Sequence, residues 1–276
     1  MSWSPTTTAS PARLQVPAML LAAGRGERMR PLTDRCPKPL LLVRGKSLLQ
    51  WQLEALLRGG CHRAVINTAW LGDLIPDTFQ SHFAIQPGQN KPDMLLNIEQ
   101  IQISYSHEGR DFGAALETAG GICRALPLLC PPAVEGGGEV FWVLAGDVFT
   151  PGFEFNGQAA ARFARSGLLA HLWLVPNPAH NPRGDFGLDA ASGLALNLAA
   201  DDPRPRYTYS TIGLYHRALF APPWCPIPAG NPQGTKAALA PLLRAAMDQG
   251  LVSAELYTGD WTDVGTPQRL AQLNTD

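Results

Sequence analysis

The chain has few charged residues and almost no net charge. Charged residues make up 16% of its 276 positions, and the formal net charge is −1. A protein this close to neutral has no bulk electrostatic attraction for nucleic acid or for an anionic membrane. The sequence therefore predicts neither as a partner, and any basic binding site has to be local.

Cysteine is scarce, and the spacing of the few cysteines present forms no recognisable motif. The five cysteines are Cys36, Cys61, Cys123, Cys130 and Cys225. Their number is odd and no pair has the two-residue gap of a zinc knuckle, so neither a disulfide framework nor a cysteine zinc site is expected. No apolar run has the length of a membrane span, and no basic start leads into a long signal core. These absences predict a cytoplasmic protein.

Short apolar runs alternate with helical patterns over the first 150 residues. Strands are expected at 16–21, 64–68, 98–104 and 140–145, and helices at 47–58, 71–83 and 117–129. Glycine-rich segments close several of these runs. This alternation predicts an α/β fold with a Rossmann-like, doubly wound and mostly parallel sheet.

The second half differs in composition, because loops rich in proline and glycine separate its short strand-like runs. We expect strands at 168–175, 186–188, 207–215 and 258–264, and a helix at 235–250. The predicted organisation is a flexible tail over 1–15 and a single domain over 16–276. Within that domain, 16–150 forms one half and 151–276 adds a substrate lobe. Residues 86–93 and 131–138 are expected to be turn-rich surface insertions.

A glycine-rich basic loop follows the first strand. Between Gly24 and Lys46 there are seven basic residues and two acidic ones, a net charge of +5 over 23 residues. Small residues at 22–24 and at Gly26 allow close backbone approach, and their amides can form an anion-binding nest. The pattern is neither a Walker loop nor a dinucleotide fingerprint, which would need glycine at Met29. The loop suits a triphosphate; a solvated basic loop is the alternative.

Two linked motifs in this region resemble a known family. Residues 21–33, of the pattern LAAGxGxRMxPLT, and residues 37–40, PKPL, are similar to the opening of the sugar-1-phosphate nucleotidylyltransferases. The resemblance implies that Arg28 and Lys38 act on the phosphates as catalytic residues. It implies nucleotide binding by Ala22, Ala23, Gly24, Gly26, Glu27, Arg28 and Lys38.

Two aspartates follow strand-like sequence at distant points of the chain. Asp147 ends an apolar run, and Asp263 precedes a helical segment. Magnesium prefers one or two carboxylates with phosphate oxygens and water, so the pair suffices for Mg2+. Helix-cap and turn roles are the alternatives. The resemblance implies that both are metal ligands, although Ala145 departs from the Asn-Gly-Asp that relatives often carry.

Residues 116–121 resemble the segment that borders the base in this family. The resemblance implies nucleotide contacts from Glu117, Thr118 and Gly120, with Thr118 as helix cap being compatible. Many uridylyl relatives have glycine at Ala119, and guanylyl relatives often have Gly-Thr-Ala-Gly, so the base is left open.

Further segments along the chain extend the resemblance to one subgroup. Residues 67–71, 109–121, 183–186, 207–213, 235–243 and 261–270 are similar to the uridylyltransferases that act on N-acetylmuramic acid 1-phosphate in cell-wall sugar recycling. Candidate sugar-phosphate contacts are Gly184, Asp185, Arg206 and Lys236. For these four, a surface turn or a solvated charge is the alternative.

The predicted partners are UTP and a sugar 1-phosphate, in a monomer or small homo-oligomer. Other possibilities are a guanylyl- or uridylyltransferase for mannose or glucose 1-phosphate, and a nucleotide-sensing relative without catalysis. Such relatives usually lose the lysine or an aspartate, whereas Lys38, Asp147 and Asp263 are all present here.

Overall fold

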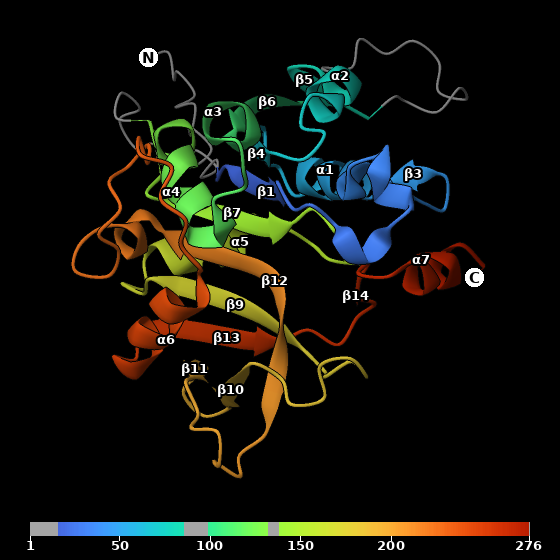
Figure 1. The fold of residues 1–276 in the computed structure, drawn as a ribbon. Coiled ribbons are helices and arrows are strands. Elements are labelled where there is room, and N and C mark those ends of the chain that lie inside the picture. The colour runs from blue at the N-terminus through green and yellow to red at the C-terminus, as the bar shows by residue number, and fades with distance from the viewer. Residues whose placement is uncertain (1–15, 86–98, 132–137, 276) are drawn as a thin grey trace, which may run out of the picture.

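The fold centres on one ten-stranded sheet with helices on both faces (Figure 1). A computed structural model describes residues 16–85, 99–131 and 138–275. The predicted tail over 1–15 and the insertion at 86–93 lie outside the described residues, as do residues 132–137 of the second insertion. Within the described part, no helix is long and apolar enough to cross a membrane.

Four parallel strands form the centre of the sheet. They are β1 (Ala18–Ala22), β4 (Arg63–Thr68), β6 (Gln100–His107) and β7 (Val140–Ala145), in the order β7-β1-β4-β6. Strand residues alternate between faces, so each strand supplies both sides of the core. Met19 belongs to one buried cluster and its neighbour Leu20 to another. The sequence prediction of these four strands is confirmed.

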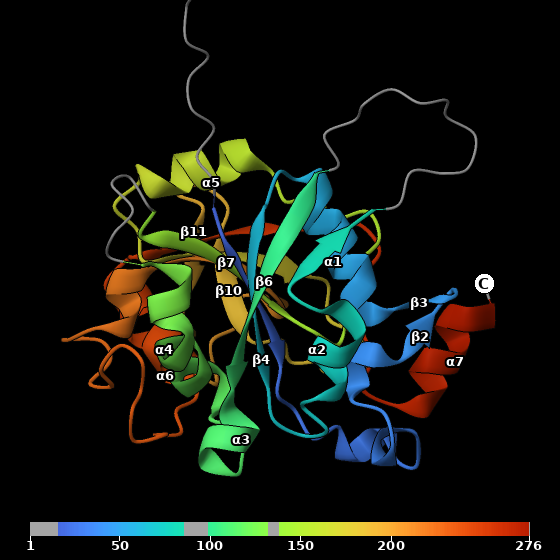
Figure 2. The same cartoon turned by 90° about the horizontal axis from the view of Figure 1, so that it is seen from above.

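Helices cover the two faces separately (Figure 2). On one face, α4 (Glu117–Leu129) and α6 (Ala240–Asp248) pack on the Met19 cluster. On the other, α1 (Leu48–Arg58), α2 (Leu74–Phe79) and α5 (Gly157–Ala164) pack on the Leu20 cluster. α1 is capped as predicted by Ser47, whose Oγ accepts a hydrogen bond from the Gln50 amide at 3.1 Å.

The second half extends the same sheet, which makes the sheet mixed. β12 (Arg206–His216) pairs antiparallel with β7 and with β9 (Ala170–Val175). β13 (Val252–Leu256) runs parallel to β9, and β11 (Leu194–Leu196) and β10 (Phe186–Asp189) form the edge. The α/β class is thus confirmed, with antiparallel strands joining the two halves.

Several predicted boundaries are wrong for local reasons. The helix expected over 71–83 ends at Phe79, because Gln80 has φ +55° and β5 (His82–Ala84) then pairs with β6. Thr118 does not cap α4, which has Leu116 before it and no side-chain cap. The helix expected from 235 begins at Ala240, with Pro241 in its first turn. Of the strand expected over 258–264 only the short β14 (Thr262–Asp263) forms, and β13 precedes that range.

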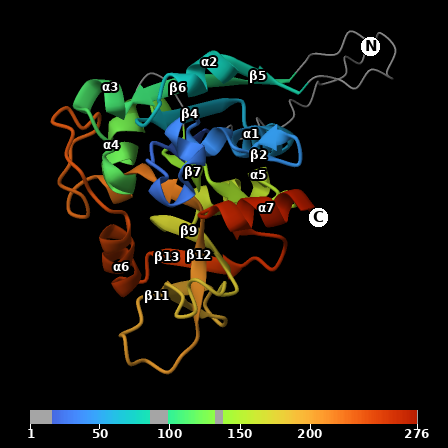
Figure 3. The ribbon, with the colours of Figure 1, turned by 45° about the vertical axis from the view of Figure 1, so that its right-hand side comes forward.

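A third, small core fixes the basic loop against the C-terminal helix. The loop contains the 3-10 turns η1 (Glu27–Met29), η2 (Leu32–Asp34) and η3 (Lys38–Leu40), followed by β2 (Leu42–Val43) and β3 (Lys46–Ser47). Met29 and Val264 are fully buried in this core, against Leu270 and Leu273 of α7 (Pro267–Thr275). Figure 3 shows α7 lying beside the loop region. Met29 therefore packs in one core with residues 235 to 244 positions further along the chain.

Candidate active site

A cavity of about 550 Å3 opens where the parallel strands β1, β4 and β7 end. This is the edge at which open α/β sheets bind ligands. Ten predicted site residues line it: Ala22, Ala23, Gly24, Gly26, Glu27, Arg28, Lys38, Glu117, Thr118 and Asp147. The cavity thus brings together the basic loop, the segment predicted to border the base, and one predicted metal ligand.

The basic loop has the backbone geometry of a tight turn. Gly26 has φ +64°, a conformation that favours glycine, and a Cβ there would lie 3.1 Å from Thr33 Cγ2. Thr33 Oγ1 donates to the Gly26 carbonyl at 2.8 Å, and the Met29 amide donates to the same carbonyl at 2.9 Å. Arg28 is exposed at the cavity wall. The turn is therefore held by its own side chains and leaves a cation at the opening.

Lys38 and Asp147 form an ion pair across the cavity. The Lys38 ammonium, with 11% of its side chain exposed, contacts Asp147 Oδ2. Asp147, 34% exposed, follows Gly146, whose amide donates to the Leu21 carbonyl at 2.8 Å. A Cβ at Gly146 would lie 2.9 Å from that carbonyl oxygen, so the close strand contact requires glycine. The end of β7 is thereby fixed, with one carboxylate directed at the predicted catalytic lysine.

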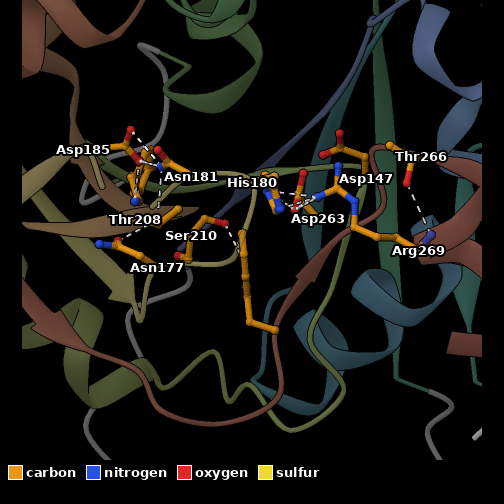
Figure 4. A network of polar contacts seen from close by, with 12 residues as sticks. Asp147, Asn177, His180, Asn181, Asp185, Thr208, Ser210, Asp263, Thr266 and Arg269 are labelled. Carbon is orange, nitrogen blue, oxygen red and sulfur yellow. Dashed lines mark hydrogen bonds and ion pairs between the residues drawn. The ribbon is translucent and has the colours of Figure 1, made fainter. Parts of the chain in front are cut away.

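The second predicted metal ligand lies on the strand next to Asp147. β14 pairs with β8 (Val148–Phe149), and the Val264 amide donates to the Asp147 carbonyl at 2.8 Å. The Asp263 carboxylate accepts from Arg269 and lies 2.9 Å from His180 Nε2 (Figure 4). The fold therefore brings together two aspartates that are 116 positions apart in sequence.

The donor set at these aspartates suits a hard cation. Both carboxylates offer oxygen only, and the described residues contain no group of three or more His, Cys, Asp or Glu arranged to hold a metal. A site of two carboxylates completed by phosphate oxygens and water is the arrangement that Mg2+ prefers. The residues present fit Mg2+ bound together with a nucleotide.

A buried carboxylate at the cavity floor was not predicted from the sequence. Glu108 is fully buried at the start of α3 (Glu108–Phe112); it accepts from Asn67 Nδ2 and from the Leu116 amide, each at 2.7 Å. Asn67 Oδ1 in turn accepts from the Ala22 amide at 2.7 Å. Burial raises the pKa of the Glu108 carboxyl, while these hydrogen bonds oppose the shift. Two sequence features pointed toward this site: polar Asn67 near the end of β4, and Glu108 directly after β6.

Glu117 begins α4 in a strained conformation. Its φ is +60°, which favours glycine, yet it carries an exposed carboxylate at the cavity wall. The Ala119 and Gly120 amides donate to the Ala237 carbonyl at 2.9 and 3.1 Å, which fixes the segment from behind. Gly120 itself does not line the cavity; a Cβ there would lie 2.5 Å from the Thr235 carbonyl oxygen.

The four predicted sugar-phosphate residues also lie outside the cavity lining. Gly184 has φ +64° and packs against Asn177. Asp185 Oδ2 accepts from the Tyr209 amide at 2.8 Å, and Asn181 donates to both carboxylate oxygens at 3.3 Å. Arg206 donates to the Ala199 carbonyl, and Lys236 is exposed. Figure 4 shows Asp185 and Asn181 grouped with Thr208 and Asn177, apart from the contacts of His180 with Asp263.

Comparison with known proteins gives relatives along nearly the whole chain. It is 42% identical over 258 residues to the N-acetylmuramate alpha-1-phosphate uridylyltransferase of Neisseria meningitidis, covering 92% of this chain and 95% of that protein. It is 30% identical to the beta catalytic subunit of mannose-1-phosphate guanylyltransferase of Xenopus tropicalis, over 91% of this chain and 61% of the relative.

A solved structure has the same fold. A crystal structure from Bacillus anthracis, described as a glucose-1-phosphate thymidylyltransferase with sucrose bound, superposes with a TM-score of 0.69 over 94% of each chain. At 17% identity this likeness supports the fold alone. The nucleotidyl transferase family matches residues 17–191, the part that contains the basic loop and Asp147. The chain belongs to the nucleotidyl transferase family.

Proposed function

We propose that this protein transfers UMP from UTP to N-acetylmuramic acid 1-phosphate, which yields UDP-N-acetylmuramic acid and pyrophosphate. The observation that carries the proposal is the cavity in which the glycine-rich loop, Arg28, Lys38 and Asp147 meet. The choice of base and sugar is supported by 42% identity, over nearly the full length, to a protein named for that reaction.

The chemistry needs positioned cations more than a protein nucleophile. An oxygen of the sugar phosphate attacks the α-phosphorus in line, the bond to the bridging oxygen of the β-phosphate breaks, and pyrophosphate leaves. Lys38 and Arg28 stabilise the charge on the phosphoryl oxygens. For Lys38 to do so, it exchanges its contact with Asp147 for a phosphate oxygen. Asp147 and Asp263 would hold Mg2+, which supplies further positive charge when bound.

The two halves of the domain would divide recognition between them. Residues 16–150 would bind the nucleotide, in a Rossmann-like arrangement with the phosphates on the loop after β1, and Glu117, Thr118 and Gly120 near the base. Residues 151–276 would bind the sugar, with Gly184, Asp185, Arg206 and Lys236 as the candidate contacts. We place the reaction in the cytoplasm, which agrees with five free cysteines among the described residues.

A substrate panel tests the reaction. UTP, GTP, CTP and dTTP are each combined with the 1-phosphates of N-acetylmuramic acid, glucosamine, glucose and mannose, and pyrophosphate release is measured. We expect UTP with N-acetylmuramic acid 1-phosphate to react fastest. Preference for GTP with mannose 1-phosphate would make the protein a guanylyltransferase. Background release with every pair would leave a nucleotide-sensing role.

Replacing the lysine tests the roles within the site. Lys38→Ala should lower kcat about 100- to 1,000-fold, because it removes a cation that contacts the reacting phosphate. Arg35→Ala is the matched control, since Arg35 belongs to the same basic segment but is exposed and outside the cavity lining. Full turnover by a folded Lys38→Ala protein would overturn the assignment.

A further inference from the structure

Arg25 stacks on Trp70 at the cavity wall. The guanidinium carbon lies 3.3 Å from the centroid of the indole ring, a cation–π contact. Arg25 also lines the cavity, and its side chain is 28% exposed. Trp70 lies in the turn after β4, so the loop after β1 is joined to the next strand of the sheet.

The ring on which Arg25 lies is itself fixed to the basic loop. Trp70 Nε1 donates to the Thr33 carbonyl at 2.9 Å. Thr33 is fully buried, and its hydroxyl holds the Gly26 carbonyl that closes the turn. The indole ring of Trp70 is thus held in a fixed position relative to the basic loop.

The guanidinium is ordered by this stacking more than by hydrogen bonds. Its contacts within the described residues are the Thr33 carbonyl at 3.4 Å and the exposed Asp34 carboxylate at 4.0 Å, both long. Asp34 is closer to Arg30, at 3.3 Å. An arginine has five N–H donors in a planar fork suited to phosphate, and most of these donors have no short contact here.

The other two cations of the cavity are arranged differently. Lys38 is paired with Asp147, whereas Arg28 is exposed and makes no hydrogen bond or ion pair with the described side chains. Arg25 is therefore the cation that is held in place with donors to spare. Its position between Gly24 and Gly26 puts it beside the backbone amides of the predicted anion nest.

We propose that Arg25 binds the nucleoside triphosphate directly and that Trp70 acts through it as a positioning residue. The proposal rests on the proposed function, and it adds a triphosphate contact that the loop motif alone does not indicate. The stacked ring fixes the guanidinium before the nucleotide arrives, so less side-chain entropy is lost on binding.

Calorimetric titration of UTP in the presence of Mg2+ tests the pair. Arg25→Ala should weaken binding about 10- to 100-fold, the range for losing hydrogen bonds to a charged group. Trp70→Leu should weaken it about 2- to 5-fold through loss of the stacking contact. The double variant should match Arg25→Ala alone, and Trp70→Phe, which keeps an aromatic face but loses the bond to Thr33, should bind UTP more tightly than Trp70→Leu and less tightly than the unaltered protein.

Arg44→Ala is the matched control. Arg44 belongs to the same basic segment and also lies over an aromatic ring, 5.5 Å from the Phe149 centroid, but it is exposed and outside the cavity lining. Its removal deletes the same charge and should leave UTP binding unchanged. Thermal unfolding of each variant without nucleotide separates a folding defect from a binding defect.

The outcomes distinguish this proposal from the one on which it rests. If the unaltered protein binds UTP and turns it over, but Arg25→Ala binds UTP as well as Arg44→Ala does, only the role of Arg25 is overturned. If the double variant is much weaker than Arg25→Ala, Trp70 acts independently and its positioning role is wrong. If the unaltered protein binds no nucleoside triphosphate, the proposed function fails first.

Discussion

At the scale of single residues, the two loops of the cavity are joined by one buried carboxylate. Glu108 accepts from Asn67 and from the Leu116 amide, and Asn67 accepts from the Ala22 amide. The chain of contacts runs from the start of the basic loop, at Ala22, to Leu116, just before Glu117. The fit is close, since a Cβ at Gly121 would lie 2.6 Å from Glu108 Oε1.

Glu108→Gln should therefore destabilise the fold and loosen the site. The new amide nitrogen would face an N–H donor, and leaving a buried donor unsatisfied costs about 1–3 kcal/mol. Urea unfolding at neutral pH measures the loss, and KM for UTP should rise more than kcat falls, because the loops move apart while the reacting groups remain. Glu154→Gln, on an exposed glutamate, is the control. Equal unfolding midpoints for the two variants would contradict the bridge.

The residues that could be predicted are those with a local signal. Gly26, Lys38 and Asp147 lie in motifs or directly after an apolar strand, and the cavity contains all three. Glu108 and the Arg25–Trp70 pair could not be predicted, because their function depends on which strand ends are neighbours in the sheet. For Gly184 and Asp185, the short motif did not indicate which way the segment faces. In the structure both lie outside the cavity lining, and Asp185 is hydrogen-bonded to Asn181 and to the Tyr209 amide.

At the scale of elements, the spacing of apolar residues and the glycines that end each run predicted the parallel strands and their helices. β7 and α4 have the bounds expected, since one is uniformly apolar and the other has a helical pattern despite Gly120 and Gly121 near its start. β13 was missed because Val252–Leu256 is only five residues long, although apolar and polar residues alternate in it, and its last two residues are exposed. Its pairing with β9 brings it into the sheet.

The pairing of β9 with β13 contains a largely buried histidine that makes stability depend on pH. His171 Nδ1 lies 2.8 Å from Ser253 Oγ, and burial lowers the pKa of His171, an effect that exceeds the opposing influence of Glu255; Arg162 lowers it further. Between the folded-state pKa and the ordinary value of about 6.5, the unfolded chain binds more protons than the folded one. Stability is thus fully present above about pH 6.5 and is lost as the pH falls below it.

His171→Gln should flatten that dependence. Free energies of unfolding measured from pH 8 to pH 5 should fall more steeply for the unaltered protein than for the variant. His82→Gln, which removes an exposed imidazole, is the comparison. Parallel curves for the unaltered protein and His171→Gln would show that protonation of His171 does not set the slope.

At the scale of the whole molecule, the two halves are one folding unit. β12 of the second half pairs with β7 of the first, and β14 pairs with β8. Phe141 packs against Tyr215 with ring centroids 6.3 Å apart, and Trp142 packs against Trp173 at 5.0 Å. Each large core cluster contains residues from both halves. The predicted division at residue 150 therefore falls within one continuous core.

This continuity predicts a single cooperative unfolding transition for the full chain. A fragment of residues 16–150 would leave the β7 edge unpaired and expose Phe141 and Trp142, which are at most 2% exposed in the intact protein. Exposing an apolar side chain of this size costs about 1.5–3 kcal/mol, and several would be exposed at once in a chain whose net stability is only about 5–15 kcal/mol. Calorimetry of the full chain should give one transition, and the fragment should show no cooperative melt by circular dichroism. A native-like melt of the fragment, or two resolved transitions in the full chain, would mean that residues 16–150 are stable alone and that Asp147 and Asp263 meet across an interface between domains.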